Sequence, residues 1–437
     1  MISGQRSEGL RGRKTLVSVS AGQVGVWVFE GSSWLLAVAW LWQAVAAAVG
    51  MRTLPDLTRP GVGGAAAGLG RGSEWAVGDG AELGLGVGPQ ITVIVPACNE
   101  EDKIEGTLRS LMATEGVRLE ILAVNDRSTD RTGARMDAVA AEAAEAAGGK
   151  HTLRVLHITE LPAGWMGKAH AMAMAGRQAT APWLLFTDGD VWFGPDALAL
   201  SLDYAEAERA DHVVLALTLE YRSVAEEAAF AAFMAQSQWT VRLWKVADPR
   251  AKDFFGAGGF SMVRREVYER LGGFAGMRME VVEDLRLAFK IKRAGYRQRV
   301  VVGPGLVRLH WNHGALGMVS LLEKNGFAAL RYSVGLALAA FVGLAVEILL
   351  PLAAIMSGGW TMVAGLLVFV GIAGVIAANR SVNQASAWMA VLFAPATAVF
   401  LFALVRSMVL TLRRNGVVWR GTLYPLDELR RNAEGSW

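Results

Sequence analysis

Two carboxylates follow a short apolar run near the middle of the chain, and they are the first candidates for chemistry. Residues 183–186 (Trp-Leu-Leu-Phe) read as a buried strand, and Asp188 and Asp190 come after it with a glycine between them. In open α/β sheets, ligands bind at the carboxyl ends of the strands. Two carboxylates at this spacing suit a hard divalent cation that keeps part of its water shell and also holds a diphosphate. The alternative is an ordinary Asp-Gly turn, which is the commoner meaning of this pattern when it stands alone.

Acidic residues also stand at the ends of other elements. Glu100 and Asp126 follow two apolar runs that read as strands, and Glu283 and Asp284 open a helix later in the chain. Because the ends of parallel strands meet at one edge of a sheet, we expect these carboxylates to face the same crevice. Two acids at a helix start also compensate the helix dipole, which is their usual structural role.

The chemistry that fits this set is the displacement of a nucleoside diphosphate from a sugar. A cation held by Asp188 and Asp190 would neutralise the leaving diphosphate. Glu100 and Asp126 would hydrogen-bond the base or the ribose. Asp284 would take the proton of the acceptor hydroxyl.

Lys168 and a glycine-rich segment add to this set. Lys168 lies at the start of a helix of small residues, where its charge opposes the helix dipole, so we expect an anion nearby. Residues 255–263 approach a strand through several glycines, which lets a ligand come close to the backbone. Both features fit a phosphate-bearing ligand.

The elements that must position these residues alternate between strands and helices. This rhythm predicts right-handed βαβ units and an α/β domain with a mainly parallel sheet. The 225–246 helix is amphipathic and is either a core helix or a helix on the membrane surface. The predicted strands are 91–96, 119–124, 153–158, 183–186, 213–221 and 300–307, and the predicted helices are 104–112, 134–147, 169–179, 195–208, 225–246 and 285–294.

Composition separates a globular part of the chain from membrane-like parts. Hydrophobic residues make up 53% of the 437 residues, and they gather near residues 31–50 and 334–412. The middle has ordinary composition and is long enough for one α/β domain. A net charge of +3 without a dense basic stripe argues against nucleic acid as a partner. The single cysteine, Cys98, excludes an intramolecular disulfide and a cysteine zinc cluster.

We predict six segments along the chain. Residues 31–50 carry no charge and are long enough to cross a bilayer, with a cleaved signal peptide as the alternative. Further spans are predicted at residues 334–356, 360–378 and 386–405. The full division is a polar N-terminus (1–30), a transmembrane helix (31–50), a Gly/Ala-rich linker (51–90), a globular domain (91–332), a membrane region (334–412) and a basic tail (413–437).

These spans conflict with the charge of the tail. One span before the globular domain and three after it would put the tail and the domain on opposite sides of the membrane. The arginines of the tail mark it as cytoplasmic. Either one apolar segment is re-entrant or lies in the interface, as an interruption at Glu347 and Pro351 allows, or the tail is extracytoplasmic despite its charge.

The order and spacing of four motifs resemble glycosyltransferase family 2, whose members have the GT-A fold. The motifs are IVPACNE at 94–100, VNDRSTD at 124–130, DGD at 188–190 and ED at 283–284. More narrowly, the chain resembles hopanoid-associated and carotenoid glycosyltransferases in its membrane-bound C-terminal region and in three short motifs. These are GWMGK at 164–168, GGF at 258–260 and KN at 324–325.

The resemblance implies a GT-A, Rossmann-like α/β domain between N-terminal and C-terminal transmembrane helices. It implies a membrane-anchored, inverting, non-processive enzyme that moves a sugar from a nucleotide sugar, with a UDP-sugar expected, to a hopanoid, carotenoid or polyisoprenoid lipid. The implied cofactor is Mg²⁺ or Mn²⁺. The implied location is the inner membrane, with the catalytic domain in the cytoplasm.

The same resemblance carries residue roles across by position. The catalytic base is Asp284, with Glu283 beside it. The metal ligands are Asp188 and Asp190. The nucleotide-sugar-binding residues are Pro96, Ala97, Glu100, Asp126, Lys168 and Asp188.

Some residues depart from the family pattern. Asn125 stands where the family often has an Asp, and no Gln-x-x-Arg-Trp follows Asp284, which argues against processive synthesis. His310 either contacts the diphosphate or is an ordinary satisfied histidine, and Cys98 receives no role. A nucleotidyltransferase is the alternative enzyme, but it would need a glycine-rich phosphate loop after the first strand. A catalytically silent scaffold is the alternative from another class.

Overall fold

Seven strands form the central sheet in a computed structural model that describes residues 21–62, 88–146, 149–310 and 314–434. β1 (Ile91–Ala97) lies inside the sheet and pairs in parallel with β2 (Leu119–Asp126) on one side and β4 (Trp183–Phe186) on the other. The register places Ala97 beside Asn125, so that β1 and β2 end at nearly the same level. The outer strands are β3 (Thr152–Ile158) beyond β2, and β8 (Ser261–Arg264), β6 (His212–Ala216) and β9 (Gln298–Val302) beyond β4.

The sheet is mainly parallel, as the sequence predicted. β3 is parallel to β2, and β6 is parallel to β9. β8 is the exception, because it runs antiparallel to both of its neighbours, β4 and β6. The glycine-rich segment before β8 therefore arrives at the same edge of the sheet at which β4 ends.

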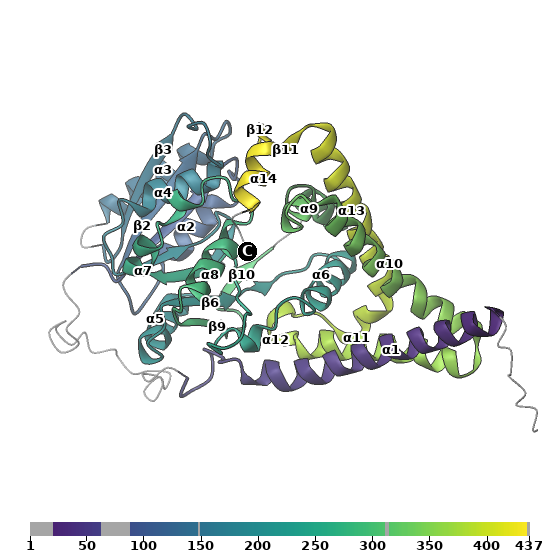
Figure 1. Cartoon of the computed structure of the whole chain (residues 1–437). Helices are drawn as coiled ribbons and strands as arrows, with labels where there is room; N and C mark the ends of the chain where they lie inside the picture. Colours follow the sequence, from purple (N-terminus) through teal and green to yellow (C-terminus); the bar gives the residue numbers. More distant parts are fainter. Residues whose placement is uncertain (1–20, 63–87, 147–148, 311–313, 435–437) are drawn as a thin grey trace, which may run out of the picture.

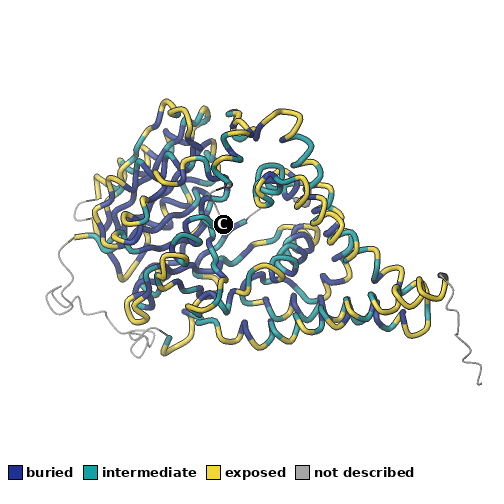
Figure 2. The backbone as a smooth tube through the Cα atoms, viewed as in Figure 1, coloured by how far each residue is buried: buried dark blue, intermediate teal, exposed yellow. Residues whose placement is uncertain are grey.

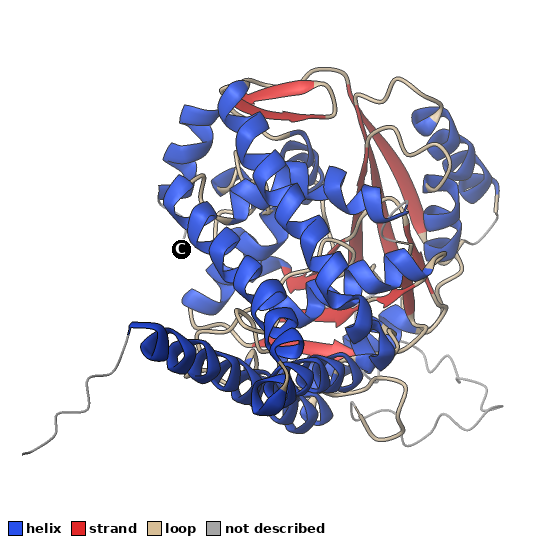
Figure 3. Ribbon diagram, turned by 90° about the vertical axis from the view of Figure 1, so that its right-hand side faces the viewer, coloured by secondary structure: helices blue, strands red, loops and turns tan. Residues whose placement is uncertain are grey.

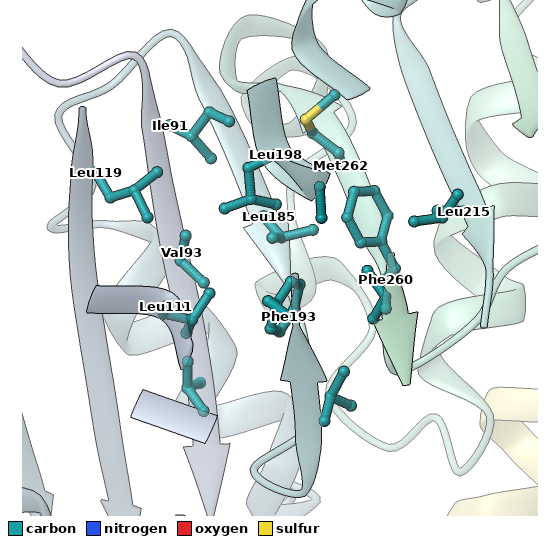
Figure 4. Packing of buried hydrophobic residues seen from close by; sticks show 14 of the residues in the cluster. Ile91, Val93, Leu111, Leu119, Leu185, Phe193, Leu198, Leu215, Phe260 and Met262 are labelled. Atoms are coloured by element: carbon teal, nitrogen blue, oxygen red, sulfur yellow. The ribbon is translucent and has the colours of Figure 1, made fainter. Parts of the chain in front are cut away.

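Alternate residues of the strands enter two different cores. Val93 and Val95 of β1 belong to one buried cluster, and Ile94 belongs to another. This alternation is the period of two expected when both faces of a sheet are covered. Figure 4 shows the first cluster, in which Leu111, Leu198 and Phe260 pack against the strands.

Helices cover both faces of the sheet (Figure 3). α2 (Ile104–Met112) and α5 (Ala197–Ala207) supply residues to the first core, and α4 (Gly167–Gly176), α7 (Arg265–Arg270) and α8 (Glu283–Arg293) supply residues to the second. α3 (Thr132–Glu145) packs beside α2 and β3. Short 3₁₀ turns lie at Met51–Thr53 (η1), Leu243–Lys245 (η2), Phe274–Gly276 (η3) and Ala387–Leu392 (η4).

Three predicted elements differ in the structure. Residues 213–221 form two strands, because β6 belongs to the central sheet and β7 (Thr218–Leu219) to a small second sheet. Residues 300–307 divide in the same way between β9 and β10 (Val307–Leu309), which lies between β5 (Val191–Phe193) and β7. The chain changes sheet within each run, which its alternating apolar pattern does not reveal. The helix predicted at 225–246 is α6 (Val224–Ser237) and ends nine residues early.

Long helices extend from this domain (Figure 1). They are α1 (Ala21–Gly50), α10 (Val334–Ser357), α11 (Gly359–Ala378) and α13 (Phe393–Arg413), joined by α9 (Gly314–Ala329) before α10 and the short α12 (Arg380–Asn383) after α11. Among the described residues, four helices are long and apolar enough to cross a membrane. Figure 2 shows that the buried backbone gathers in the sheet domain, whereas α1 and α10 expose much of their length.

The predicted polar N-terminus and the predicted linker have other bounds in the structure. α1 begins at Ala21, so ten residues of the predicted polar N-terminus are helical, and residues 1–20 lie outside the described part. Residues 51–62, assigned to the linker, follow the edge of the sheet, where the Leu57 amide donates a hydrogen bond of 2.8 Å to the Val302 carbonyl. Residues 63–87 of that linker also lie outside the described residues.

The basic tail is folded. It forms a hairpin of β11 (Gly416–Trp419) and β12 (Thr422–Pro425), followed by α14 (Leu426–Glu434). Val417, Tyr424 and Leu429 are buried in the same core cluster as Ile94 of β1. The tail is therefore part of the globular domain, and in Figure 1 it lies beside the carboxyl edge of the sheet.

Candidate active site

The turn after β4 lies level with the end of β1. The Thr187 amide donates to the Ile94 carbonyl (3.2 Å), and the Thr187 hydroxyl donates to the Gly259 carbonyl (2.8 Å). The hydroxyl of Thr107 on α2 donates to the Gly189 carbonyl (3.0 Å). These bonds fix the backbone that carries Asp188 and Asp190.

Asp188 belongs to a compact charged cluster. Lys168 Nζ lies 2.7 Å from Asp188 Oδ1 and 2.6 Å from Glu283 Oε1. Burial alone would lower the pKa of Lys168, but the negative charges of Asp188, Glu283 and Asp284 raise that pKa well above its usual value. Lys168 therefore stays positively charged, and the carboxylates of Asp188 and Glu283 are anions of the kind expected beside it.

Gly258 lets the loop before β8 approach this cluster. A Cβ atom at residue 258 would lie 2.7 Å from Asp188 Oδ2 and 3.2 Å from Lys168 Nζ. Any other side chain would displace the carboxylate or the ammonium group. The close backbone approach predicted for residues 255–263 therefore occurs at Asp188 and Lys168.

Asp284 lies next to this ion pair at the start of α8. Burial and the neighbouring negative charge of Glu283 raise the pKa of Asp284 to about 6, although Lys168 acts in the opposite direction. The Leu285 amide donates to Asp284 Oδ1 (2.8 Å). A carboxylate with a pKa in this range can accept a proton near neutral pH, which is the property needed in a general base.

Asp190 has the opposite electrostatic situation to Asp188. Burial and the negative charge of Asp188 raise the pKa of Asp190, while Lys103, whose Nζ lies 3.2 Å from Asp190 Oδ2, lowers it. Burial would also raise the pKa of Asp188, but Lys168 lowers it. Because Lys168 is also paired with Glu283, the three carboxylates of Asp188, Asp190 and Glu283 outnumber the two lysines that contact them.

This pair fits a hard divalent cation. Both donors are carboxylate oxygens, and a cation would relieve the repulsion that raises the pKa of Asp190. Within the described residues, no group of three or more His, Cys, Asp and Glu side chains is arranged to hold a metal by itself. The remaining ligands would be diphosphate oxygens and water, as is usual for Mg²⁺ bound with a nucleotide.

The candidate nucleoside residues line the ends of β1 and β2. Pro96 and Ala97 are buried at the end of β1. Asp126 is buried and accepts a hydrogen bond from Arg127 Nε (2.7 Å). Glu100 lies beyond β1 and forms an ion pair of 2.7 Å with Arg420 of the tail.

Arg420 and Lys324 are charged residues that the sequence analysis gave no role. Arg420 stands in the tight turn between β11 and β12, with φ of 47°. Lys324 comes from α9, and its Nζ lies 4.3 Å from the centre of the Trp419 ring. Burial and the charge of Lys168 lower the pKa of Lys324, while Glu283 and Asp284 raise it. The two short runs on either side of Arg420-Gly421 could have predicted the hairpin. Nothing in the sequence near this hairpin indicated that Arg420 pairs with Glu100.

The sequence also drew attention to His310 and Cys98. His310 Nε2 lies 3.3 Å from Glu226 Oε2 at the start of α6, which is a contact that an ordinary paired histidine makes. Cys98 is buried, and burial raises the pKa of its thiol.

Comparison with known proteins bears directly on these motifs. Residues 92–285 match the family model "Glycosyl transferase family 2". The chain contains a family 2 glycosyltransferase domain. The matched segment includes every residue given a role by the resemblance, from Pro96 to Asp284.

Two curated proteins are similar to this chain. It is 29% identical over 224 residues to "Probable glycosyltransferase YdaM" of Bacillus subtilis (strain 168), covering 48% of each protein. It is 34% identical over 103 residues to the 4,4'-diaponeurosporenoate glycosyltransferase of Staphylococcus haemolyticus (strain JCSC1435), covering 23% of this chain and 24% of that one. The chain thus spans about half the length of the first relative and about a quarter of the second. A carotenoid-type glycosyltransferase is among the relatives, as the motifs suggested.

Solved structures of glycosyltransferases are also similar. One is the mannosyltransferase PcManGT of Pyrobaculum calidifontis in complex with GDP-Man and Mn²⁺, which is 18% identical with a TM-score of 0.49, covering 87% of this chain and 99% of that chain. Another is S. aureus TarS in complex with UDP, which is 15% identical with a TM-score of 0.36, covering 76% of this chain and 95% of that chain.

Proposed function

We propose that this protein is a membrane-anchored, inverting glycosyltransferase that moves one sugar from a nucleotide sugar to a lipid-like acceptor. The observation that carries the proposal is the position of Asp284, whose pKa is raised to about 6, beside the Lys168–Asp188 ion pair. This arrangement sets a proton acceptor next to a candidate diphosphate site within a family 2 glycosyltransferase domain. The proton acceptor and the diphosphate site that direct displacement needs are thus adjacent.

In this proposal each motif residue has one role. Pro96, Ala97, Glu100 and Asp126 contact the nucleoside, and Lys168 binds the diphosphate. Asp188 and Asp190 would hold Mg²⁺ or Mn²⁺, which neutralises the leaving diphosphate when it is bound. Glu283 holds Lys168 in place through their 2.6 Å contact.

Asp284 acts on the acceptor. It takes the proton of the acceptor hydroxyl as the acceptor oxygen forms a bond to the anomeric carbon and the bond from that carbon to the diphosphate breaks. One displacement inverts the anomeric centre and needs no covalent intermediate. Because no Gln-x-x-Arg-Trp follows Asp284 in the sequence, we propose a single transfer and not processive synthesis.

The acceptor is proposed to be a lipid, and the donor a UDP-sugar. The long apolar helices beside the domain support a bilayer as the source of the acceptor. The match to a diaponeurosporenoate glycosyltransferase supports a hopanoid, carotenoid or polyisoprenoid chain. The basic residues of the tail support an inner-membrane location with the domain in the cytoplasm.

A panel of labelled nucleotide sugars tests this proposal. Membranes that contain the full chain are incubated with each donor and a divalent cation, and the lipid fraction is analysed by mass spectrometry. The expected product is a lipid heavier by one sugar, formed by the native chain and not by Asp284→Asn. Asp196→Asn, an exposed residue outside the site, is the matched control and should form product normally.

Other outcomes would overturn the proposal. A product heavier by a nucleotidyl group would make the protein a nucleotidyltransferase. No product from any donor, with nucleotide binding retained, would indicate a silent scaffold. Several sugars added to one acceptor would contradict the non-processive part of the proposal.

A further inference from the structure

The apolar segments around α11 and α13 both meet the length and hydropathy expected of a membrane span. The apolar segments around them have mean hydropathies of 2.4 and 2.2, and the same share of each, 44%, is buried. At about 1.5 Å per residue, each helix is about as long as the hydrocarbon core is thick. If all four long helices crossed, the globular domain and the tail would lie on opposite sides of the bilayer.

The tail lies on the globular domain. Arg420 is paired with Glu100, and the Gly167 amide of α4 donates to the Tyr424 hydroxyl (3.3 Å). Val417 and Leu429 are buried in the second core. Domain and tail are therefore on the same side, and an even number of the helices α10, α11 and α13 crosses the membrane.

α10 and α11 have the arrangement expected of the two helices that cross. They form a pair of antiparallel helices joined at Gly358, and α11 packs on α1, where a Cβ at Gly371 would lie 2.7 Å from Trp40 Cβ. The C-terminal end of α11 contacts the globular domain. There, Asn379 Nδ2 donates a hydrogen bond to Oε1 of Gln238, which directly follows α6 (3.1 Å). Exposed apolar side chains such as Met356 and Trp360 lie around the far turn.

α13, in contrast, is bound near both ends to elements on the domain side. Before it, the Ser386 amide donates to Glu227 of α6 (2.7 Å). Near its end, Arg406 and Arg414 form ion pairs with Glu323 of α9 (3.1 and 3.0 Å). Figure 1 shows α13 running across the direction that α1 and α11 share.

The outer face of α13 has a composition suited to a membrane surface. Between residues 391 and 406, exposed residues recur every three or four positions. This spacing places them along one stripe of the helix. The stripe starts apolar and ends at Arg406, so its first part can be buried below the headgroups while its basic end lies at their level. The stripe consists of Val391, Pro395, Ala398, Phe402 and Arg406.

We propose that α13 lies in the headgroup region of a phospholipid bilayer on the side of the globular domain, and that the chain crosses the bilayer three times, through α1, α10 and α11. The occupant of the α13 stripe is lipid. This proposal shares the membrane location with the proposed function but none of its chemistry, so either can fail alone.

Single cysteines can locate each segment, because the chain has one cysteine, Cys98, which is buried. In a Cys98→Ser background, four exposed positions are replaced singly and labelled with a membrane-impermeant maleimide in sealed vesicles of each orientation. Trp360→Cys reports the α10–α11 turn, and Trp388→Cys and Arg413→Cys report the two ends of the α13 segment. Glu160→Cys reports the globular domain.

We expect Glu160→Cys, Trp388→Cys and Arg413→Cys to label in vesicles of one orientation, and Trp360→Cys in the other. Labelling of Arg413→Cys together with Trp360→Cys would overturn the proposal, because α13 would then cross. Thermal unfolding of each purified variant in detergent checks folding. A variant that fails this check is replaced by a cysteine at a neighbouring exposed residue, with Leu412 standing in for Arg413.

Depth measurements separate a surface helix from a crossing helix by a second route. Phe402 and Val370 are exposed apolar residues near the middle of α13 and of α11. A fluorophore on Phe402→Cys should be quenched best by lipids labelled near the headgroup, and one on Val370→Cys by lipids labelled near the chain end. Equal, deep quenching at both positions would contradict the proposal. Neither readout depends on sugar transfer.

Discussion

The candidate site has two halves of opposite charge, and they come from different parts of the chain. The half within residues 92–285 consists mainly of carboxylates at the ends of strands and at a helix start, and its two lysines, Lys168 and Lys103, are already paired with carboxylates. The other half, from α9 and the tail hairpin, brings the cations Lys324 and Arg420. In the proposed function, the family domain would supply acids for a cation and a proton, and the C-terminal region would supply positive charge for a phosphate-bearing donor.

The comparison also separates two kinds of electrostatic cost. In the acidic half, burial and then the repulsion of a neighbouring carboxylate raise the pKa of Asp190 and of Asp284. In the basic half, burial lowers the pKa of Lys324. The charged forms of Asp190, Asp284 and Lys324 are thus all disfavoured in the absence of a ligand. A bound cation would stabilise the carboxylates, and a bound diphosphate would stabilise the lysine. The predictions below test the halves separately.

The largest effect is expected from Asp284→Asn. Removal of a general base lowers the rate of transfer by about 10²–10⁴-fold. Binding of the nucleotide and the cation should be almost unchanged, because Asp188 and Asp190 remain. Product formation and nucleotide binding by calorimetry measure the two effects. Turnover at the native rate would remove Asp284 from the base role.

A smaller effect is expected from Asp190→Ala. Loss of one cation ligand should lower transfer by on the order of 10²-fold, with weaker nucleotide binding when Mn²⁺ is present. Titration of the nucleotide with and without Mn²⁺ checks this, and Asp196→Asn serves again as the control. Full activity of the native chain in the presence of a chelator would contradict the metal role.

Stability should change with pH in a direction set by Asp284. Its folded-state pKa of about 6 lies above the usual value of 3.8, so its ionised form is disfavoured by the fold, and that loss of stability grows as the pH rises from about 4 to 6. Asp284→Asn should raise stability by about 1–3 kcal/mol at pH 7.5 and by nothing measurable below pH 4. Thermal unfolding at both pH values checks it. An equal change at both would point to packing and not to charge.

The same pKa predicts the pH dependence of transfer. Asp284 acts as a base only when ionised, so kcat/KM should rise as the pH passes upward through about 6. Initial rates of transfer measured across this pH range check the expectation. If kcat/KM did not change through pH 6, Asp284 would not be the base.

The smallest effect, on the basic half, is expected from Arg420→Ala. Loss of a charge-assisted contact should raise the KM for the donor by about tenfold, with kcat much less affected. Arg420→Lys should keep part of the affinity because it keeps the charge. Arg413→Ala, an exposed arginine at the end of α13, is the matched control. A fall in kcat at unchanged KM would show that the basic half acts on chemistry and not on binding.

The sequence predicted much of the acidic half because its signals are local. Asp126 and Asp188 follow apolar runs that form β2 and β4, and parallel pairing of these strands with β1 brings their ends together. The wrong division of residues 213–221 and 300–307 has a local cause as well, because an alternating run does not show at which residue it changes sheet. Predictions that depended on one element at a time mostly agreed with the structure.

The basic half and the tail could not be predicted in this way. Arg420 is 320 residues from Glu100 in the chain, and a charge run at the end of a membrane protein reads equally well as a topology signal. Only the packing of Val417 and Tyr424 into the second core decides that the tail belongs to the domain.

By itself, the sequence determined the order of the strands and helices in the domain, the carboxylates at their ends and the helices that are apolar enough for a membrane. These properties depend on residue type and spacing along a single element. The tertiary structure decided which charges meet, namely Lys168 with Glu283 and Arg420 with Glu100, and which helices have both ends on the domain. Contacts between distant segments depend on how whole elements pack, and the hydropathy of a segment, which marks both α11 and α13 as able to cross a membrane, does not show which other elements its ends contact.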